Sequence, residues 1–299
     1  MTLTAQIKAK ALEMGFDLVG IALAKPHEDF HFFNEWIGKG YQGGMAYLER
    51  GREKRGDPSI ILPGAKSFIC CGLNYFQGFS KRGISNYAWG EDYHEVFLEK
   101  LKELERFILE IAPQGRMKSY VDTGAILERS YAAGAGLGWI GKNTCLIDTK
   151  KGSFFFIGEI LTDLDLDPDK PVADHCGTCT RCLDACPTQA LTPYELNATQ
   201  CISYLTIEHR GEIAPELQAK MGNHLVGCDI CQDVCPWNKK VPLGSEEAFK
   251  PRPENLDFSL TTLQKMTPEE FSSRFKGSPI KRLKWEGLMR NVEIARKNS

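Results

Sequence analysis

Cysteines at fixed spacing constrain this chain more than any other feature. The run from Cys176 to Pro187 reads C-x2-C-x2-C-x3-C-P, and the run from Cys228 to Pro236 reads C-x2-C-x3-C-P. The first run is the full bacterial ferredoxin pattern, in which three close thiolates bind one 4Fe-4S cluster and the fourth cysteine binds a neighbouring cluster. We therefore expect two iron-sulfur clusters in this part of the chain.

The exchange of the last cysteine between the two runs divides the ligands into two sets. Cys235 would complete the first cluster and Cys186 would join the second, which leaves the second cluster one ligand short. Cys201 is the only other cysteine in this section, so we expect it to be that ligand. The first set is then Cys176, Cys179, Cys182 and Cys235, and the second set is Cys186, Cys201, Cys228 and Cys231. Structural zinc also uses C-x2-C pairs, but two zinc sites do not explain this spacing followed by proline.

Composition places the chain among ordinary globular proteins. Its 299 residues are 42% hydrophobic and 25% charged, and no stretch reaches the roughly 18 apolar residues that a membrane span needs. We expect a cytoplasmic protein, in which thiols stay reduced and clustered cysteines indicate metal binding or catalysis. Of the 11 cysteines, Cys70, Cys71 and Cys145 lie outside the two sets, and the first two are expected to be small buried residues of a strand.

The region before the cysteines predicts an α+β fold or an α/β sandwich. Its apolar patterns predict strands over 67–73 and 154–161 and a helix over 93–111. The acidic stretch 162–169 ends this region and is expected to be a solvated linker. A helix is expected near the C-terminus, with Thr267 as its N-cap. The domain boundaries that we predict are 1–170, 171–241 and 242–299.

The densest chemical signal before the cysteines is the stretch 120–143. Asp122-Thr123-Gly124 matches an aspartic protease loop but occurs once, whereas those enzymes use two aspartates. Gly136, Gly138 and Gly141 match a dinucleotide-binding string, yet a helical pattern precedes them where that motif needs a strand. We expect the glycines to let the backbone approach a large flat cofactor. Asp122 could alternatively cap the helix that follows.

Several segments taken together resemble epoxyqueuosine reductase over nearly the whole chain. The segments are 121–124, 138–143, the ferredoxin run, 201–208, 227–238 and 278–282, of which the last three together are specific to that family. The resemblance implies a cobalamin-dependent enzyme that reduces epoxyqueuosine, at the wobble position of certain tRNAs, to queuosine with loss of water. It implies a nitroreductase-like cobalamin-binding domain, a bacterial ferredoxin-like two-cluster domain and a short helical C-terminal segment. Electrons would pass from an external donor through two 4Fe-4S clusters to cobalamin.

The resemblance also assigns roles to single residues. Asp122 is the expected proton donor, and desolvation beside a cofactor should raise its pKa toward the protonated form that a general acid needs. The family binds cobalamin without a histidine on cobalt, so His94 is not expected to be a cobalt ligand. Cys145 could approach the corrin or be a buried thiol. The residues expected to contact cobalamin are Arg55, Tyr87, Ala88, Asp92, Tyr93, His94, Asp122, Lys142, Asn143 and Ile157.

A tRNA partner requires a local basic surface, because the formal net charge is −2. Residues 274–299 carry eight basic and two acidic side chains, a patch that can neutralise phosphates or can simply be a solvated helix face. Trp237 or Trp285 could support the target base, although Trp237 could instead shield a cluster. The candidate tRNA contacts are His209, Arg210, Lys281, Arg282, Lys284 and Arg290.

Many members of the family continue into helical repeats that help to hold tRNA, so we expect a short form that relies on its catalytic body, acting as a monomer. Three alternatives stay open at this point. One is a corrinoid iron-sulfur reductase of a small molecule, like a reductive dehalogenase, although those enzymes typically carry a twin-arginine signal that is absent here. Another is a ferredoxin-type electron carrier, which would not explain the 170 residues before the clusters. The third is an RNA-binding protein with structural clusters.

Overall fold

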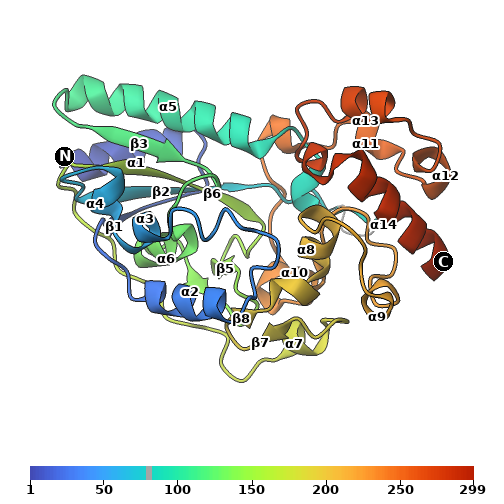
Figure 1. The fold of residues 1–299 in the computed structure, drawn as a ribbon. Coiled ribbons are helices and arrows are strands. Elements are labelled where there is room, and N and C mark those ends of the chain that lie inside the picture. The colour runs from blue at the N-terminus through green and yellow to red at the C-terminus, as the bar shows by residue number, and fades with distance from the viewer. Residues whose placement is uncertain (79–82) are drawn as a thin grey trace.

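The computed structural model describes residues 1–78 and 83–299. A four-stranded antiparallel sheet with the order β1-β2-β6-β3 forms the centre of the N-terminal half (Figure 1). Its strands are β1 (Leu18–Leu23), β2 (Ser67–Asn74), β3 (Met117–Tyr120) and β6 (Phe155–Thr162). The two strands predicted from apolar runs are thus confirmed to within one residue at each end. They lie side by side at the centre of the sheet, with Cys71 opposite Gly158.

Helices cover both faces of this sheet, which explains why its central strands read as continuous apolar runs. Helices α1 (Leu3–Glu13) and α5 (Tyr93–Ile111) pack on one face, and α6 (Glu128–Gly134) packs on the other. Alternate residues of β2 pack into the cores on the two faces of the sheet, because successive side chains of a strand point to opposite faces. Cys71 faces α1 and α5, whereas Cys70 faces α6, and both are fully buried as predicted.

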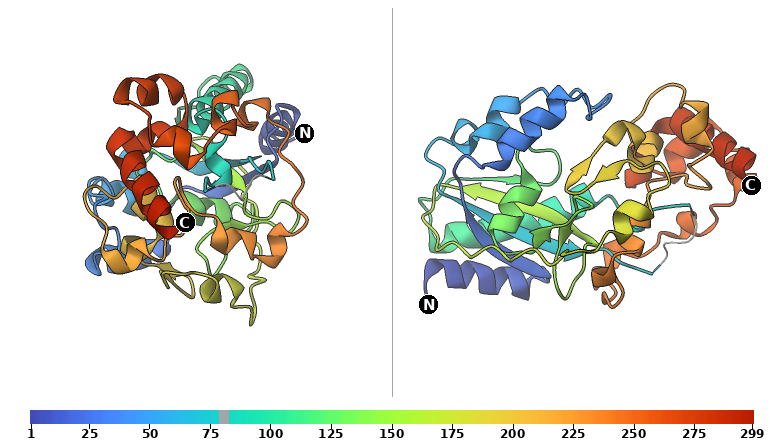
Figure 2. Two further views of the ribbon diagram at one scale, coloured as in Figure 1. Left: turned by 90° about the vertical axis from the view of Figure 1, so that its right-hand side faces the viewer. Right: turned by 90° about the horizontal axis from the view of Figure 1, so that it is seen from below.

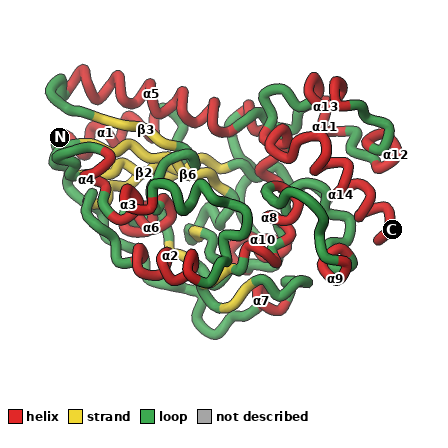
Figure 3. The backbone as a smooth tube through the Cα atoms, in the orientation of Figure 1, coloured by secondary structure: helices red, strands yellow, loops and turns green. Residues whose placement is uncertain are grey.

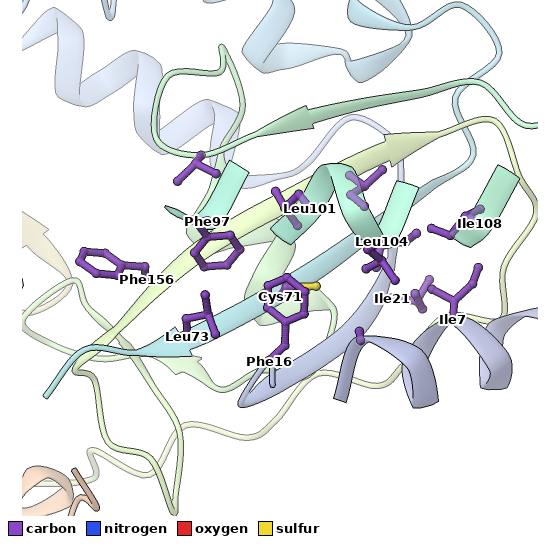
Figure 4. Packing of buried hydrophobic residues seen from close by; sticks show 14 of the residues in the cluster. Ile7, Phe16, Ile21, Cys71, Leu73, Phe97, Leu101, Leu104, Ile108 and Phe156 are labelled. Carbon is purple, nitrogen blue, oxygen red and sulfur yellow. The ribbon is translucent and has the colours of Figure 1, made fainter. Parts of the chain in front are cut away.

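Helix α5 begins and ends where its apolar spacing predicted. Phe97, Leu101, Leu104 and Ile108 form a fully buried stripe that packs against the sheet (Figure 4). On the sheet side, Gly158 makes room for the Phe97 ring, because a Cβ there would lie 2.3 Å from it. The fit fixes the N-terminal end of α5 over the edge of the sheet where the candidate site lies.

The remaining elements are short and lie mostly in the cysteine-rich and C-terminal regions (Figures 2 and 3). Before the cysteines they are α2 (Asp29–Gly38), α3 (Arg52–Gly56), α4 (Pro58–Ile61), η1 (Asn86–Ala88) and the hairpin of β4 (Trp139–Ile140) and β5 (Leu146–Ile147). The cysteine-rich region contains α7 (Arg181–Asp184), β7 (Leu191–Thr192), β8 (Glu195–Leu196), η2 (Ala198–Gln200), α8 (Ile202–Ile207), α9 (Pro215–Gln218), α10 (Ile230–Asp233) and η3 (Pro236–Asn238). The C-terminal region contains η4 (Glu247–Phe249), α11 (Pro253–Leu256), α12 (Leu260–Leu263), α13 (Pro268–Arg274), η5 (Pro279–Leu283) and α14 (Lys284–Asn298).

The C-terminal helices share a core with earlier parts of the chain. Phe275 and Leu288 pack in one apolar cluster with Trp89, which precedes α5, and with Val226, which precedes the second cysteine run. Helix α13 starts with the predicted cap, since the Thr267 side chain and Glu270 form a reciprocal capping box. The C-terminal region is therefore part of the scaffold around the cysteines.

The acidic stretch 162–169 is a packed strap, so the expectation of a solvated linker was wrong. Leu164 and Leu166 are buried in the core beneath α1 and α5. Asp165 and Asp167 are exposed, and Asp169 pairs with Lys8 at 2.7 Å. Among the described residues, none of the helices is both long enough and apolar enough to span a bilayer.

Candidate active site beside the cysteine region

The structure brings the seven cysteines of the two runs, together with Cys201, into two groups. Cys235, from the second run, packs with Cys176, from the first, beside Trp139 and Trp237. Burial raises the pKa of Cys182, and the neighbouring thiols of Cys176 and Cys235 raise it further. The first group consists of Cys176, Cys179, Cys182 and Cys235.

The second group contains the last cysteine of the first run. Cys201 and Cys228 pack into one apolar cluster, and Cys186 and Cys231 lie with them around one cavity. The groups have the membership that the exchange of cysteines predicts, while their role as iron ligands stays a prediction. In the part of the chain that the structure describes, no three His, Cys, Asp or Glu side chains converge on a single metal ion. The four ligands of a 4Fe-4S cluster bind different iron atoms, so their side chains lie farther apart than the ligands of a single metal ion.

Two adjacent residues in the β4–β5 turn hold the two cysteine loops. The Lys142 Nζ donates to the carbonyls of Gly177 at 2.6 Å and Cys179 at 3.1 Å, both in the first run. The Asn143 Nδ2 donates to the carbonyl of Cys231 at 3.3 Å, in the second run. A hairpin that packs against α6 thus positions both cysteine runs relative to the sheet.

The second run also docks on the segment before α5. The Asp229 carboxylate accepts hydrogen bonds from the backbone N–H of Asn86 at 2.6 Å and from its side-chain amide at 3.0 Å. Gly227 has a φ of 69°, and a Cβ there would lie 2.3 Å from the Ser85 hydroxyl. Glycine is therefore required where this run approaches the segment.

A cavity of about 340 Å³ lies where the sheet meets the cysteine region. Its volume falls in the range of small-molecule sites. The lining combines the second cysteine group with Asp122 and Glu128. Much of the rest is aromatic, and its rings are Tyr75, Tyr87, Tyr93, Phe155 and Phe156. The cavity therefore joins thiols, carboxyl groups and flat apolar side chains in one space.

Asp122 occupies the apex of a tight turn after β3. The N–H of Thr123 donates to the carbonyl of Val121 at 2.6 Å, and Asp122 has a φ of 58°. This combination is a γ-turn of the rare, strained kind. The alternative that Asp122 caps a helix is wrong, because α6 begins at Glu128 with Leu127 as its N-cap.

Three side chains hold Asp122 in this turn. The Tyr93 hydroxyl donates to its Oδ2 at 2.8 Å, and the Nε2 of His94 lies 3.4 Å from the same oxygen. On the backbone side, the N–H of Asp122 donates to the Oε1 of Glu128 at 2.7 Å. The other ring nitrogen of His94, Nδ1, lies 2.7 Å from Asp92, which caps α5.

The electrostatics contradict the expected protonation of Asp122. Burial opposes its ionisation, but the hydrogen bonds from His94 and Tyr93 outweigh that effect and hold the pKa of Asp122 below its ordinary value. Its side chain lines the cavity. Asp122 is therefore ionised at neutral pH.

The site nevertheless holds two protons next to Asp122. Burial alone would lower the pKa of His94, but its hydrogen bonds with Asp122 and Asp92 raise it to about 9. Burial and the charge of Asp122 raise the pKa of Glu128 to about 8. At neutral pH the charged imidazole and the neutral Glu128 carboxyl flank the Asp122 carboxylate, as expected for coupled acids that share protons.

Comparison with known proteins decides the family. A model described as "4Fe-4S double cluster binding domain" matches residues 175–238, and one described as "Epoxyqueuosine reductase QueG, DUF1730" matches residues 55–123. An epoxyqueuosine reductase of Leadbetterella byssophila is 46% identical, over 97% of each chain. This chain belongs to the epoxyqueuosine reductase family. It is thus grouped with iron-sulfur oxidoreductases, and this sets aside the dehalogenase-like, electron-carrier and purely RNA-binding alternatives.

Solved epoxyqueuosine reductases share the fold. The enzyme from Streptococcus thermophilus matches with a TM-score of 0.91 and 31% identity, covering 100% of this chain and 82% of that one. A second structure, with a TM-score of 0.88 and 33% identity over 99% and 81% of the two chains, includes an epoxyqueuosine-modified tRNA-Tyr stem loop. A Bacillus subtilis enzyme, with a TM-score of 0.89 and 32% identity over 99% and 81%, has its catalytic aspartate loop swung out of the active site.

Half of the residues expected to contact cobalamin line the cavity described above. Those on its lining are Tyr87, Tyr93, Asp122, Asn143 and Ile157. Those outside it are Arg55, Ala88, Asp92, His94 and Lys142. The Arg55 guanidinium instead holds the carbonyls of Leu48 and Arg50, and Ala88 is fully buried.

Three of the residues expected to contact tRNA form hydrogen bonds within the protein. The Arg290 guanidinium donates to the carbonyls of Leu205 at 2.6 Å and His209 at 2.8 Å. Arg210 donates to the carbonyl of Arg282 at 2.8 Å. The ring of His209 also contacts a backbone carbonyl. The hydrogen bonds of Arg290 and Arg210 join the cysteine-rich region to α14 and η5.

The other basic candidates lie on the surface. Lys281 and Lys284 are exposed at the start of α14. Arg282 forms a bidentate pair with Glu208, and its guanidinium lies 5.6 Å from the centre of the Tyr47 ring. The charge of Asp122 raises the pKa of both Arg282 and Tyr47, so this pair lies close enough to the Asp122 turn to interact with it electrostatically.

The two tryptophans considered for base stacking are packed. Trp237 contacts Trp139 and Cys235, which favours the alternative that it shields the first cysteine group. Trp285 donates from its ring nitrogen to the carbonyl of Met266 at 2.8 Å and packs against the C-terminal core.

Two residues of the site were missed from the sequence. They are Glu128 and Tyr75, which both line the cavity. Glu128 lies six residues after Asp122, and the stretch between them forms neither a helix nor a strand, so no regular repeat predicts their contact. Cys145 lines the cavity, and its thiol contacts that of Cys231.

Proposed function

We propose that this chain reduces epoxyqueuosine in tRNA to queuosine. Both C–O bonds of the epoxide break, two electrons and two protons are taken up, and the oxygen leaves as water. The observation that carries the proposal is the single cavity whose lining includes both the second cysteine group and Asp122. Electrons and protons can therefore be delivered to the same space.

The two cysteine groups would hold the two 4Fe-4S clusters. Their membership supports this assignment, and so does the double-cluster family model over 175–238. Only the second group lines the cavity, while the first lies beneath Trp139 and Trp237. An external electron donor would thus reduce the first cluster, and electrons would move one at a time to the second.

Cobalamin would occupy the cavity. The fit rests on the aromatic lining formed by Tyr75, Tyr87, Tyr93 and neighbouring rings, which suits a large flat ring system, and on the thiol group beside it. When bound, cobalamin would supply redox chemistry at cobalt between the second cluster and the substrate. Asn143 and Ile157 would contribute further contacts.

Asp122 would deliver the first proton to the epoxide oxygen. At neutral pH this proton resides on the Nε2 of His94, 3.4 Å from the Oδ2 of Asp122. Substrate binding excludes water from the carboxylate and so raises its proton affinity, which favours transfer from His94 to Asp122. Tyr93 keeps the accepting oxygen oriented through its 2.8 Å hydrogen bond.

The tRNA would bind over the surface that carries Lys281, Lys284 and the Arg282–Tyr47 pair. Exposed lysines neutralise phosphates, and an exposed tyrosine can stack on a base that has left the anticodon loop. Tyr47 is 39% exposed and close enough to Asp122 to feel its charge. A tRNA-bound relative supports the same substrate for this chain.

The decisive test is anaerobic turnover of a defined substrate. The chain is first reconstituted with iron, sulfide and cobalamin. It is then mixed with a chemical reductant and an epoxyqueuosine-containing stem loop, and the masses of the nucleosides are measured by mass spectrometry. We expect the mass of queuosine, which is lower by one oxygen atom. Omitting cobalamin is the matched control. No mass change in the fully loaded protein would refute the proposed reaction, and full turnover without cobalamin would refute the proposed cofactor.

A further inference from the structure

The carboxyl group of Glu128 contacts the backbone of Asp122 and not its side chain. Its Oε1 accepts the Asp122 N–H at 2.7 Å, and Glu128 also lines the cavity. The proposed function uses the Asp122 carboxyl but gives Glu128 no role. Glu128 is thus a second acid of the cavity whose role remains to be assigned.

The turn that Glu128 holds is unfavourable by itself. Asp122 has a φ of 58°, a region that non-glycine residues rarely adopt, and it is closed by the short hydrogen bond between Thr123 and Val121. Such strain persists only where surrounding contacts over-determine the backbone. The N–H of Asp122 points away from its own turn, and Glu128 is the partner that fixes its direction.

The two residues belong to parts of the structure with different rigidity. Asp122 lies in a stretch without helix or strand, from 121 to 127. Glu128 is the first residue of α6, whose Tyr131 and Ala132 are buried against the sheet. A side chain on a packed helix can place a loop residue more accurately than the loop itself can.

We infer that Glu128 is the positioning residue that holds the Asp122 turn in its reactive geometry, by binding the Asp122 N–H from the start of α6. The inference rests on the proposed role of Asp122 as proton donor. It predicts that the acceptor oxygen of Glu128 matters, and that its ability to ionise does not. A displacement of about 1 Å at a reacting group can lower a rate by about 100-fold.

Three substitutions separate positioning from charge. E128Q keeps an acceptor oxygen at the same place and should keep kcat within about 5-fold of the native value. E128A removes the acceptor, and E128D withdraws it by one methylene while keeping the acid, so both should lower kcat by about 100-fold. The KM for the stem loop should change by less than about 3-fold in all three, because the substrate still binds. E110Q, at the exposed far end of α5, is the matched control.

Hydrogen exchange gives a readout that does not depend on turnover or on cobalamin. The Asp122 N–H should exchange at least about 10-fold faster in E128A and E128D than in native protein and in E128Q. Cluster absorbance and the melting temperature show whether each variant folds, and E128D decides the matter if E128A does not fold. Native exchange and kcat in E128D, or equal loss of kcat in E128Q and E128D, would overturn the inference. Full turnover by D122N would instead overturn the proposed role of Asp122, while the exchange data would still test Glu128.

Discussion

The Nε2 of His94 lies 3.4 Å from the Oδ2 of Asp122, in a pair that carries one proton for the site at neutral pH. The pair joins the first turn of α5 to the loop after β3. It separates the group that stores the proton from the group that would deliver it. A carboxyl can in this way serve as a general acid although its own pKa lies below the ordinary value.

Replacing Asp122 by asparagine should abolish most turnover and leave the cofactor sites intact. Loss of a positioned proton donor typically lowers a rate by about 100- to 10,000-fold. We expect D122N to retain its iron, its cobalamin and its affinity for the stem loop. Single-turnover assays and iron analysis check this, with D165N on the exposed strap as the control. Native turnover in D122N would show that another group delivers the proton.

The activity should depend on pH through His94. Because its pKa is raised to about 9, His94 is charged below that pH and loses its proton as the pH rises through it. Turnover should therefore be sustained at neutral pH and fall as the pH rises through about 9, where His94 loses its proton.

The variant H94Q tests the same point. Without the imidazole, the pKa of Asp122 should rise, and the alkaline fall in kcat should move to lower pH, with at least about a 10-fold loss at pH 8. A full pH profile of kcat for native protein and H94Q measures this shift. Superimposable profiles would contradict proton storage on His94.

The exchange of cysteines between the runs can be tested by pairs of substitutions. C176A and C235A should each remove about four iron atoms per chain, and the double variant should lose no more than either alone, because both would serve one cluster. C176A combined with C228A should lose about eight. C70A, on the buried strand β2, is the control. Additive loss in C176A/C235A would show that the groups are not the cluster sites.

Two basic residues of the C-terminal region should behave differently. R290A removes hydrogen bonds to buried carbonyls that join α14 to the cysteine region, so we expect a loss of about 2 kcal/mol in stability. K284A should leave the stability unchanged and weaken binding of the stem loop, with a salt slope smaller by about one. Urea unfolding and binding at several salt concentrations measure both. A stability loss in K284A or none in R290A would reverse these assignments.

Local patterns predicted the parts of the fold that depend on neighbours along the chain. The stripe from Phe97 to Ile108 repeats at helical spacing, so helix α5 could be placed within its true bounds. The capping signals at Thr267 and Glu270 fixed the start of α13 for the same reason. The cysteine spacing led to seven of the eight expected ligands, because it reflects the geometry of a cluster, whereas Cys201 was inferred as the remaining cysteine of that section. The roles of all eight as iron ligands stay predictions.

Long-range contacts could not be predicted. Nothing near Arg290 indicates that its guanidinium meets carbonyls of Leu205 and His209, so the residue was counted among surface charges. The Asp122 pKa was predicted from desolvation alone, because the approach of His94 and Tyr93 depends on how α5 lies over the sheet. The strap at 162–169 carried a readable signal, since its leucines alternate with aspartates as in a half-buried strand, but its charges suggested a linker.

The crossing of cysteines between the two runs sets an order for making the protein. On the proposed ligand sets, the first cluster needs Cys235 and the second needs Cys231, so neither site is complete until the ribosome has passed the second run. Before that point, the chain contains no complete set of four ligand thiols. Lys142 and Asn143 bind the backbone of the two cysteine loops and not their sulfur atoms. These hydrogen bonds can therefore position both loops before any iron is bound.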